Sequence, residues 1–361
     1  MRHFSVLMII GLAISAGAQE KDILVGVSYF AGWWEASPNK WHGADGADWR
    51  PRYPDRMPLL GLYNNQETMD KEIRAAADYG VDFFSILWYY NPPGKEREPN
   101  SRFLERGVLD FMHSPENHRM RFMVEYCNHP PYDAATEEDW ARCIEFWKQC
   151  FAHPSYLRIE GKIVFKVHGA FYFYQQNQAG PAQCRKRLDQ LREAVRQAGL
   201  GEMILGGGVG SGEAIPEGHW ADEIFDFTGT YMDLPDLPRT PEDYPYQRLA
   251  GFIADNRRKH KADHKPYLPF IAAGWAPRPW PDSRAYFAFP TKEEWTAALE
   301  GVRADLNQCP ALGFPGQRAF TIYAWNEFGE GGILAPTEGA RYERLEAIRK
   351  IFASSPQNTT H

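Results

Sequence analysis

Hydrophobic residues occur along this chain in short, nearly continuous runs, separated by segments in which they recur every three to four positions. The runs are typical of strands buried on both faces, and they predict strands at residues 23–30, 81–90, 121–126, 163–167, 203–206, 225–231, 267–273 and 319–325. The periodic segments predict helices at residues 66–79, 102–112, 136–151, 183–198, 245–260, 292–307 and 342–352. Strands that alternate with helices indicate a parallel sheet, and eight such units close a (β/α)8 TIM barrel.

A doubly wound open sheet is the alternative arrangement of the same elements. It is disfavoured because no Gly-x-Gly-x-x-Gly follows the first predicted strand, and the run 206–208 after the fifth strand lacks that spacing. No linker interrupts the pattern. The sequence therefore predicts a single-domain barrel over residues 19–354, followed by a polar tail at 355–361.

The first 18 residues have the features of a secretory signal peptide. Arg2 precedes an apolar run at 4–14, and the small residues at 15–18 form an Ala-x-Ala type cleavage site that ends at Ala18. This run is too short to span a membrane, and no later stretch approaches roughly 18 apolar residues. We therefore expect an exported protein, secreted or periplasmic, without a membrane span.

The net charge and the aromatic content limit the classes of molecule that this protein is expected to bind. A net charge of −7 argues against nucleic acid and against an anionic membrane surface. Aromatic residues make up 14% of the chain, including 12 tryptophans, and aromatic faces can stack on sugar rings as well as fill a core. A carbohydrate partner fits this composition.

The active site of a TIM barrel lies at the carboxyl ends of its strands, so the residues there are the candidates for function. Acids, aromatic residues and other polar side chains gather at these ends: Tyr29, Trp33, Trp88, Tyr89, Glu125, His129, His168, Tyr231, Trp275, Arg278, Asn326, Glu327 and Glu330. Carboxylates that supply acid and base within a ring of aromatic side chains are expected of a glycosidase. Each residue also has a structural alternative. The aromatic residues could pack the barrel mouth, the histidines could be satisfied at its rim, and Lys166 could be an ion-pair partner for Glu125.

The last strand carries the strongest chemical signal. The apolar run from Thr321 to Trp325 leads directly into Asn326 and Glu327, and glycines flank a second acid, Glu330. Carboxylates at the end of a buried strand are costly to desolvate and are typically kept for their chemistry. We interpret Glu327 and Glu330 as catalytic and expect their proximity to separate their pKa values. No metal-binding, Gly-x-Ser-x-Gly or cofactor motif accompanies them, so we predict neither a metal nor a cofactor.

Several of these segments resemble known families. The sequence Trp-Asn-Glu-Phe-Gly-Glu-Gly at 325–331 resembles the Asn-Glu-Trp-x-Glu-Gly motif of glycoside hydrolase family 99 (endo-α-mannosidases and endo-α-mannanases) and of the related WbsX-like proteins. The tracts 58–63, 79–84 and 153–162, together with the pair 274–275, resemble further segments of these proteins. The resemblance covers most of the chain that follows the predicted signal peptide.

The resemblance implies a retaining, endo-acting (β/α)8 glycosidase. In these families the first motif glutamate, here Glu327, deprotonates the sugar 2-hydroxyl, which attacks C1 to give a 1,2-anhydro sugar. The second, here Glu330, is general acid and then general base. The resemblance also implies that Glu125 binds substrate and that Tyr231 is the active-site tyrosine. Phe328 replaces the motif tryptophan and Ala276 replaces an aspartate, so α-mannoside specificity does not follow.

Three alternatives remain open. Glu125 and Glu330 could act across the sugar as an ordinary retaining pair. The protein could be a glycosyltransferase, the name under which WbsX-like proteins are filed, although no Asp-x-Asp site is present and a cleaved signal peptide would separate it from cytoplasmic sugar nucleotides. It could also be an inactive carbohydrate-binding barrel, which the retained glutamates argue against.

Overall fold

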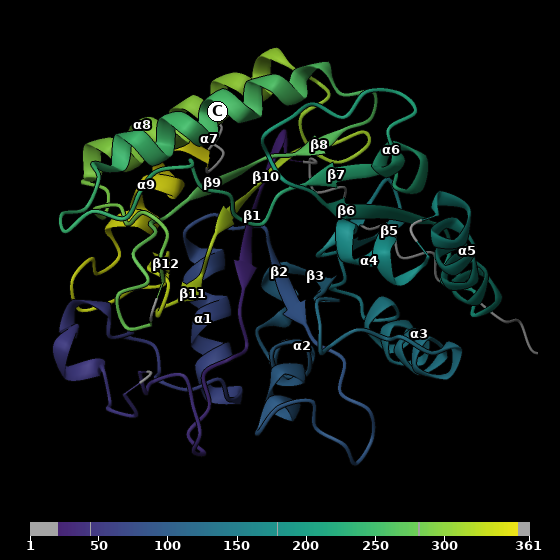
Figure 1. The fold of residues 1–361 in the computed structure, drawn as a ribbon, viewed down its shortest axis with the longest axis horizontal. Coiled ribbons are helices and arrows are strands. Elements are labelled where there is room, and N and C mark those ends of the chain that lie inside the picture. Colours follow the sequence, from purple (N-terminus) through teal and green to yellow (C-terminus); the bar gives the residue numbers. More distant parts are fainter. Residues whose placement is uncertain (1–20, 44, 179, 281, 353–361) are drawn as a thin grey trace, which may run out of the picture.

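The structure is a computed structural model that describes residues 21–43, 45–178, 180–280 and 282–352. The predicted signal peptide and the polar tail at 355–361 lie outside the described residues. Within them the chain folds as a single domain in which helices surround a central sheet (Figure 1). No helix of the described part has the length and apolar character needed to cross a bilayer.

Nine parallel strands of the described chain form a nearly closed barrel. The strands, in their order around the sheet, are β8 (Tyr267–Leu268), β7 (Phe227–Gly229), β6 (Met203–Gly208), β5 (Lys162–Val167), β3 (Arg121–Tyr126), β2 (Phe83–Trp88), β1 (Ile23–Tyr29), β10 (Arg318–Tyr323) and β9 (Phe270–Ala272). A short β4 (Arg158–Ile159) pairs antiparallel with β5. The predicted barrel is confirmed, and every predicted strand contributes to it.

The seventh predicted strand, at 267–273, forms two strands instead of one. Pro269 separates β8, which pairs with β7, from β9, which pairs with β10. Proline has no N–H to donate to a ladder, so it interrupts a strand at this point. Its carbonyl still accepts a hydrogen bond from Thr321 N at 2.9 Å, which ties the interruption to β10.

The helices lie between the strands along the chain and cover the outside of the barrel (Figure 1). They are α1 (Gln66–Asp78), α2 (Arg106–His113), α3 (Glu137–Phe151), α4 (Ala170–Gln176), α5 (Pro181–Gln197), α6 (Trp220–Ile224), α7 (Tyr246–Lys259), α8 (Lys292–Gln308) and α9 (Glu343–Phe352). All seven predicted helices are present. The sequence reading missed α4 and α6, which are too short to show a clear helical period.

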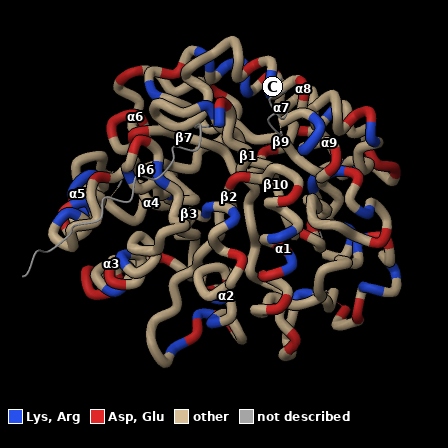
Figure 2. Tube along the Cα trace, turned by 180° about the vertical axis from the view of Figure 1, so that it is seen from behind, with Lys and Arg blue, Asp and Glu red and all other residues tan. Residues whose placement is uncertain are grey.

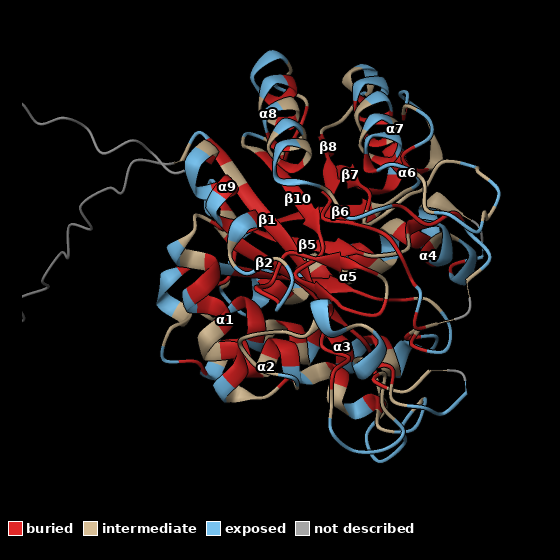
Figure 3. Cartoon of the chain, turned by 90° about the vertical axis from the view of Figure 1, so that its left-hand side faces the viewer, coloured by how far each residue is buried: buried red, intermediate tan, exposed pale blue. Residues whose placement is uncertain are grey.

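Burial follows the pattern from which the fold was predicted. The strands are buried along almost their whole length, and each longer helix turns a buried stripe inward and an exposed face outward (Figure 3). Charges of both signs are interspersed on the helices (Figure 2).

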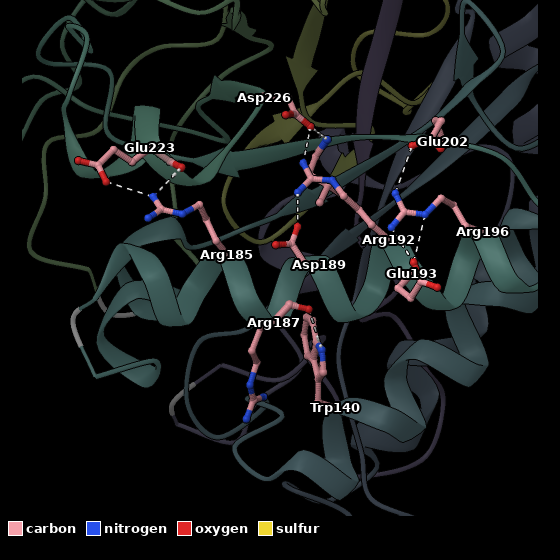
Figure 4. Close-up of polar contacts among 11 residues, drawn as sticks. Trp140, Arg185, Arg187, Asp189, Arg192, Glu193, Arg196, Glu202, Glu223 and Asp226 are labelled. Atoms are coloured by element: carbon pink, nitrogen blue, oxygen red, sulfur yellow. Dashed lines mark hydrogen bonds and ion pairs between the residues drawn. The ribbon is translucent and has the colours of Figure 1, made fainter.

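Arginines of α5 form ion pairs within the helix and with neighbouring segments (Figure 4). Arg192 and Arg196 pair with Asp189 and Glu193 of the same helix, and Arg185, Arg192 and Arg196 pair with Glu223, Asp226 and Glu202 outside it. Exposed pairs of this kind contribute little to stability individually.

Candidate active site

A tight hairpin follows β10 and carries both predicted catalytic acids. Strands β11 (Asn326–Glu327) and β12 (Gly332–Ile333) pair antiparallel, and the Glu327 carbonyl accepts hydrogen bonds from Glu330 N at 3.1 Å and Gly331 N at 2.8 Å. Gly331 has φ of 87°, a conformation that favours glycine. The Gly-rich sequence therefore closes a turn that brings Glu330 close to Glu327.

A buried arginine fixes the position of this hairpin. Arg56, 4% exposed, ends the 3-10 turn Pro54–Arg56 and donates to Phe328 O at 3.0 Å, Gly329 O at 3.2 Å and Ala276 O at 2.7 Å. Burial lowers its pKa to about 10, so it stays charged at neutral pH. The guanidinium joins the turn between Glu327 and Glu330 to the loop after β9.

A cavity of about 710 Å³ opens in front of the hairpin. Six of the predicted site residues line it together: Tyr89, His129, His168, Tyr231, Glu327 and Glu330. Among the other lining residues are Phe30, Trp34, Lys40, Glu98, Tyr132 and Trp280. Two acids, aromatic faces and polar groups thus surround one space large enough for sugar rings.

Glu327 is buried and held by a tyrosine. The residue is only 6% exposed, and Tyr231 Oη donates a hydrogen bond to Glu327 Oε1 at 2.7 Å. Burial, with the nearby charge of Glu330, raises the pKa of Glu327 to about 8, although the Tyr231 hydrogen bond and Lys40 act in the opposite direction.

Glu330 lies in a more strongly positive environment. Burial raises the pKa of this carboxyl as well, while a hydrogen bond from Tyr323 and the charges of Arg284 and Lys40 lower it. Because two neighbouring buried carboxylates cannot both ionise cheaply, the pair retains a proton at neutral pH. In the free site the raised pKa of Glu327 places this proton on Glu327. The family resemblance instead implies that Glu330 carries the proton when the reaction begins.

Glu125 lies behind the cavity wall and does not line the cavity. Its Oε1 accepts from Lys166 Nζ at 2.8 Å and lies 2.8 Å from His168 Nδ1, while Ser85 Oγ donates to Oε2 at 2.7 Å. Burial alone would raise its pKa, but Lys166 and His168 hold the pKa well below the usual range for glutamate. Because ionised Glu125 can only accept, the His168 nitrogen that faces it, Nδ1, carries a proton. The other ring nitrogen, Nε2, makes no contact with Glu125.

Four other predicted residues are buried beneath the site rather than in it. Tyr29 donates to Glu72 at 2.7 Å, and Trp88 stacks on Phe146 with ring centroids 5.1 Å apart. Trp33 packs in an aromatic cluster and donates through its indole to the carbonyl of Asn326 at 2.7 Å. The Asn326 side chain bonds both backbone groups of Phe30, so it joins the end of β1 to the hairpin.

Two further cavities border the first. One of about 480 Å³ shares Tyr231 and Glu330 with it and is also lined by Trp275, Asp233 and Arg284. The other, about 850 Å³, shares Trp280 and contains the predicted Arg278, whose guanidinium is paired with Asp243. Trp275 and Arg278 therefore line the two bordering cavities instead of the central one.

Sequence reasoning missed the residues that long loops bring to the site. Lys40 comes from the loop between β1 and α1, and Trp280 and Arg284 come from the loop between β9 and α8. The glycine at position 329 was the one weak sign of Trp280 in the sequence. A Cβ there would lie 2.3 Å from the Trp280 ring, so the close approach of this ring requires a glycine. The described residues contain no group of three or more His, Cys, Asp or Glu side chains arranged to hold a metal ion.

A (β/α)8 barrel with a pair of buried acids in an aromatic-walled cavity at its carboxyl end has the architecture of a carbohydrate-active enzyme. The family described as "Glycosyltransferase WbsX" matches residues 39–348, and the chain belongs to this family. The predicted WbsX-like relationship is thus confirmed. The search of curated proteins found no match.

Solved structures with the same fold include several glycoside hydrolases. A "glycoside hydrolase-like protein" superposes with a TM-score of 0.62 at 16% identity, over 93% of this chain and 95% of that one. The GH99 endo-α-mannosidase from Bacteroides thetaiotaomicron gives 0.56 at 16% identity, over 91% and 95%. An exo-β-1,4-mannosidase from Opitutaceae bacterium strain TAV5 gives 0.51 at 11% identity, over 91% of this chain and 58% of that one.

Proposed function

We propose that this protein is a retaining glycoside hydrolase that cleaves within a polysaccharide or glycan chain. The observation that carries the proposal is the placement of Glu327 and Glu330 on one turn, buried and facing one cavity, where burial raises the pKa of both carboxyls. Acid and base on the same wall suit a reaction in which the sugar supplies its own nucleophile.

In the first step Glu330 donates a proton to the leaving glycosidic oxygen as the bond from C1 breaks. Glu327 removes the proton of the 2-hydroxyl, and O2 forms a bond to C1 to give a 1,2-anhydro sugar. In the second step Glu330 takes a proton from water, whose oxygen attacks C1. The C1–O2 bond breaks and O2 recovers its proton from Glu327, so the net reaction is hydrolysis with retention. This route requires O2 to be trans to the leaving group.

The proton balance of the free site sets a condition on this mechanism. Since the pKa of Glu327 is about 8, the shared proton must reach Glu330 when substrate binds. Arg284 and Lys40 stabilise ionised Glu330 in the free site, so substrate binding must offset their effect on this carboxyl. Tyr231 stabilises the carboxylate that Glu327 becomes.

The position of the 480 Å³ cavity supports endo action. The 480 Å³ cavity meets the central cavity at Tyr231 and Glu330, so sugar units could extend on both sides of the acid. We also propose export of the protein, on the basis of the N-terminal sequence. Its substrate would then be an extracellular or periplasmic glycan.

Glycosyl transfer is the second candidate, and the family description favours it. The same pair of acids would pass the sugar to an acceptor hydroxyl instead of water. The two functions differ in their product. Hydrolysis yields a new reducing end for each bond cleaved, whereas transfer to an acceptor yields none.

The first test is incubation with a panel of α-mannans and other microbial and plant glycans, with products separated by chain length. Wild type is compared with Glu327→Gln and Glu330→Gln, and Glu300→Gln on the exposed face of α8 serves as a control. We expect reducing ends that both site variants abolish and the control retains. Release that survives both substitutions would overturn the assignment of the site.

A second test separates the two roles once the sugar is known. A glycosyl fluoride of that sugar needs no protonation of its leaving group, so Glu330→Gln should still release fluoride in the first step while losing turnover of the glycan. The second step of this variant lacks the base for water, so an anionic nucleophile such as azide should restore its turnover of the fluoride. Glu327→Gln should lose both, because the 2-hydroxyl still needs a base. The reverse pattern would exchange the two roles.

A further inference from the structure

Lys40 is a cation inside the central cavity without an acidic partner. Its side chain lines the cavity, and no carboxylate of the described residues forms an ion pair with it. Its Nζ lies 5.5 Å from the centre of the Phe30 ring and 5.3 Å from that of Trp280. Aromatic faces stabilise an ammonium group but leave its hydrogen-bond donors unused.

The position of Lys40 is built into the fold. The next residue, Trp41, is fully buried, and the Trp49 indole donates to the Lys40 carbonyl at 2.8 Å. Trp280 is set against the catalytic turn, because only a glycine at position 329 leaves room for its ring. The backbone on one side and two rings on the other thus hold the ammonium group within the cavity.

The positive lining continues beyond Trp280. The 850 Å³ cavity that shares this residue contains Arg52, Arg239 and Arg278. Arg52 pairs with Asp45, and Arg278 pairs with Asp243. Arg239 has no carboxylate partner among the described residues, and its guanidinium lies 3.6 Å from the centre of the Tyr286 ring. Each of the two cavities that share Trp280 thus contains one cation without an ion-pair partner among the described residues.

We propose that Lys40 and Arg239 select a glycan that carries anionic groups, such as carboxylates or sulfate esters. The proposal rests on the proposed function, because it names the substrate class of the same site. The sugar ring would lie against Trp280, with its anionic group at the Lys40 ammonium and that of a neighbouring unit near Arg239. Repulsion by Glu98, Glu327 and Glu330, which line the same cavity, confines the anion to the Lys40 side.

Another role for Lys40 has to be separated from this one. Its charge lowers the pKa of Glu327 and of Glu330, so it could serve only to adjust their acidity. A tuning role predicts an equal effect on neutral and anionic substrates and a shifted pH–rate profile. Selection of an anion predicts an effect confined to anionic substrates.

The experiment is affinity gel electrophoresis of the full chain in three polymers. These are a neutral α-mannan, the same mannan after chemical sulfation, and the same mannan with its primary hydroxyls oxidised to carboxylates. We expect tighter retardation in one or both anionic polymers, weakened by added salt. The anion that binds more tightly identifies the group. Equal retardation in all three polymers, or in none, would overturn the proposal.

The variants are Lys40→Gln, Arg239→Gln and, as a control, Lys186→Gln, which removes the same charge from the exposed face of α5. Lys40→Gln and Arg239→Gln should each weaken binding of the anionic polymer about fivefold and leave binding of the neutral polymer unchanged. An equal loss in the control would reduce the effect to net charge and refute the proposal. Binding is measured here without turnover, so the two proposals can fail separately. Binding that depends on Lys40 without any hydrolysis would refute the proposed function alone. Hydrolysis without a preference for anionic polymers would refute this inference alone.

Discussion

Replacement of Arg56 by methionine tests how the turn that carries Glu327 and Glu330 is held. Methionine fills much of the same volume but donates no hydrogen bonds, so the three carbonyls bound by the guanidinium lose their donor. Ala276 O keeps a second donor, Arg278 N at 2.7 Å. Phe328 O and Gly329 O have no other protein donor in the described structure, and they lie on the turn between the two glutamates.

The magnitude follows from these two carbonyls. Each buried polar group left without a partner costs about 1–3 kcal/mol, while removal of a buried cation returns part of that cost. We therefore expect Arg56→Met to lower the free energy of unfolding by about 3 kcal/mol. Displacement of the turn should also lower kcat at least about tenfold, which corresponds to about 1.4 kcal/mol of transition-state stabilisation.

Two measurements check this expectation. Urea unfolding gives the stability change, and amide hydrogen exchange of the segment 324–334 reports whether the turn itself opens more often. Arg74→Met, at an exposed position of α1, is the matched control and should change the unfolding free energy by less than about 0.5 kcal/mol. An Arg56→Met protein with wild-type stability and wild-type exchange in this segment would refute the reasoning.

Two further predictions follow from the carboxyl groups of the barrel. Because the folded pKa of Glu327 is about 8, the folded state binds more protons than the unfolded state between about pH 4.5 and 8. Wild type should therefore lose stability as pH rises through this window, and urea unfolding of Glu327→Gln should show a smaller loss; the same slope in both proteins would contradict the raised pKa. Glu125→Gln should cost about 3 kcal/mol, because it leaves the Lys166 ammonium buried without a counter-charge. Urea unfolding at pH 7 checks this, and a change below about 1 kcal/mol would contradict the cost assigned to the unpaired ammonium.

The fold could be predicted from the sequence because its signals are local and repeated. Each strand is an apolar run and each longer helix shows its own period, so the count of units did not depend on any single element. The prediction failed only where a single residue acts locally, as at Pro269, or where an element is too short to show a period, as in α6. Strand ends were also sufficient to place Glu327 and Glu330 together, because one short turn connects them.

The walls of the site could be predicted only in part. Position at a strand end does not say which way a side chain points. Trp88 turns outward against α3, whereas Tyr89, one residue later, reaches the cavity. Lys40 and Trp280 come from loops whose paths depend on packing between distant segments, such as the Trp33–Trp280 stack with ring centroids 6.2 Å apart. No local pattern encodes such a contact.

Glu125 illustrates how the structure changes the meaning of a residue that the sequence marked as functional. Its carboxylate is already bound by Lys166, His168 and Ser85, so it has little capacity left for a sugar hydroxyl. What it does instead is fix the ring of His168, which lines the cavity and packs against Tyr231 with centroids 4.9 Å apart. Tyr231 in turn donates to Glu327. The acid of β3 is thus joined to the acid of the hairpin through two aromatic rings. An ordinary retaining pair formed by Glu125 and Glu330 would require this buried carboxylate to give up the ammonium and imidazole that bind it, whereas Glu327 reaches the cavity as it stands.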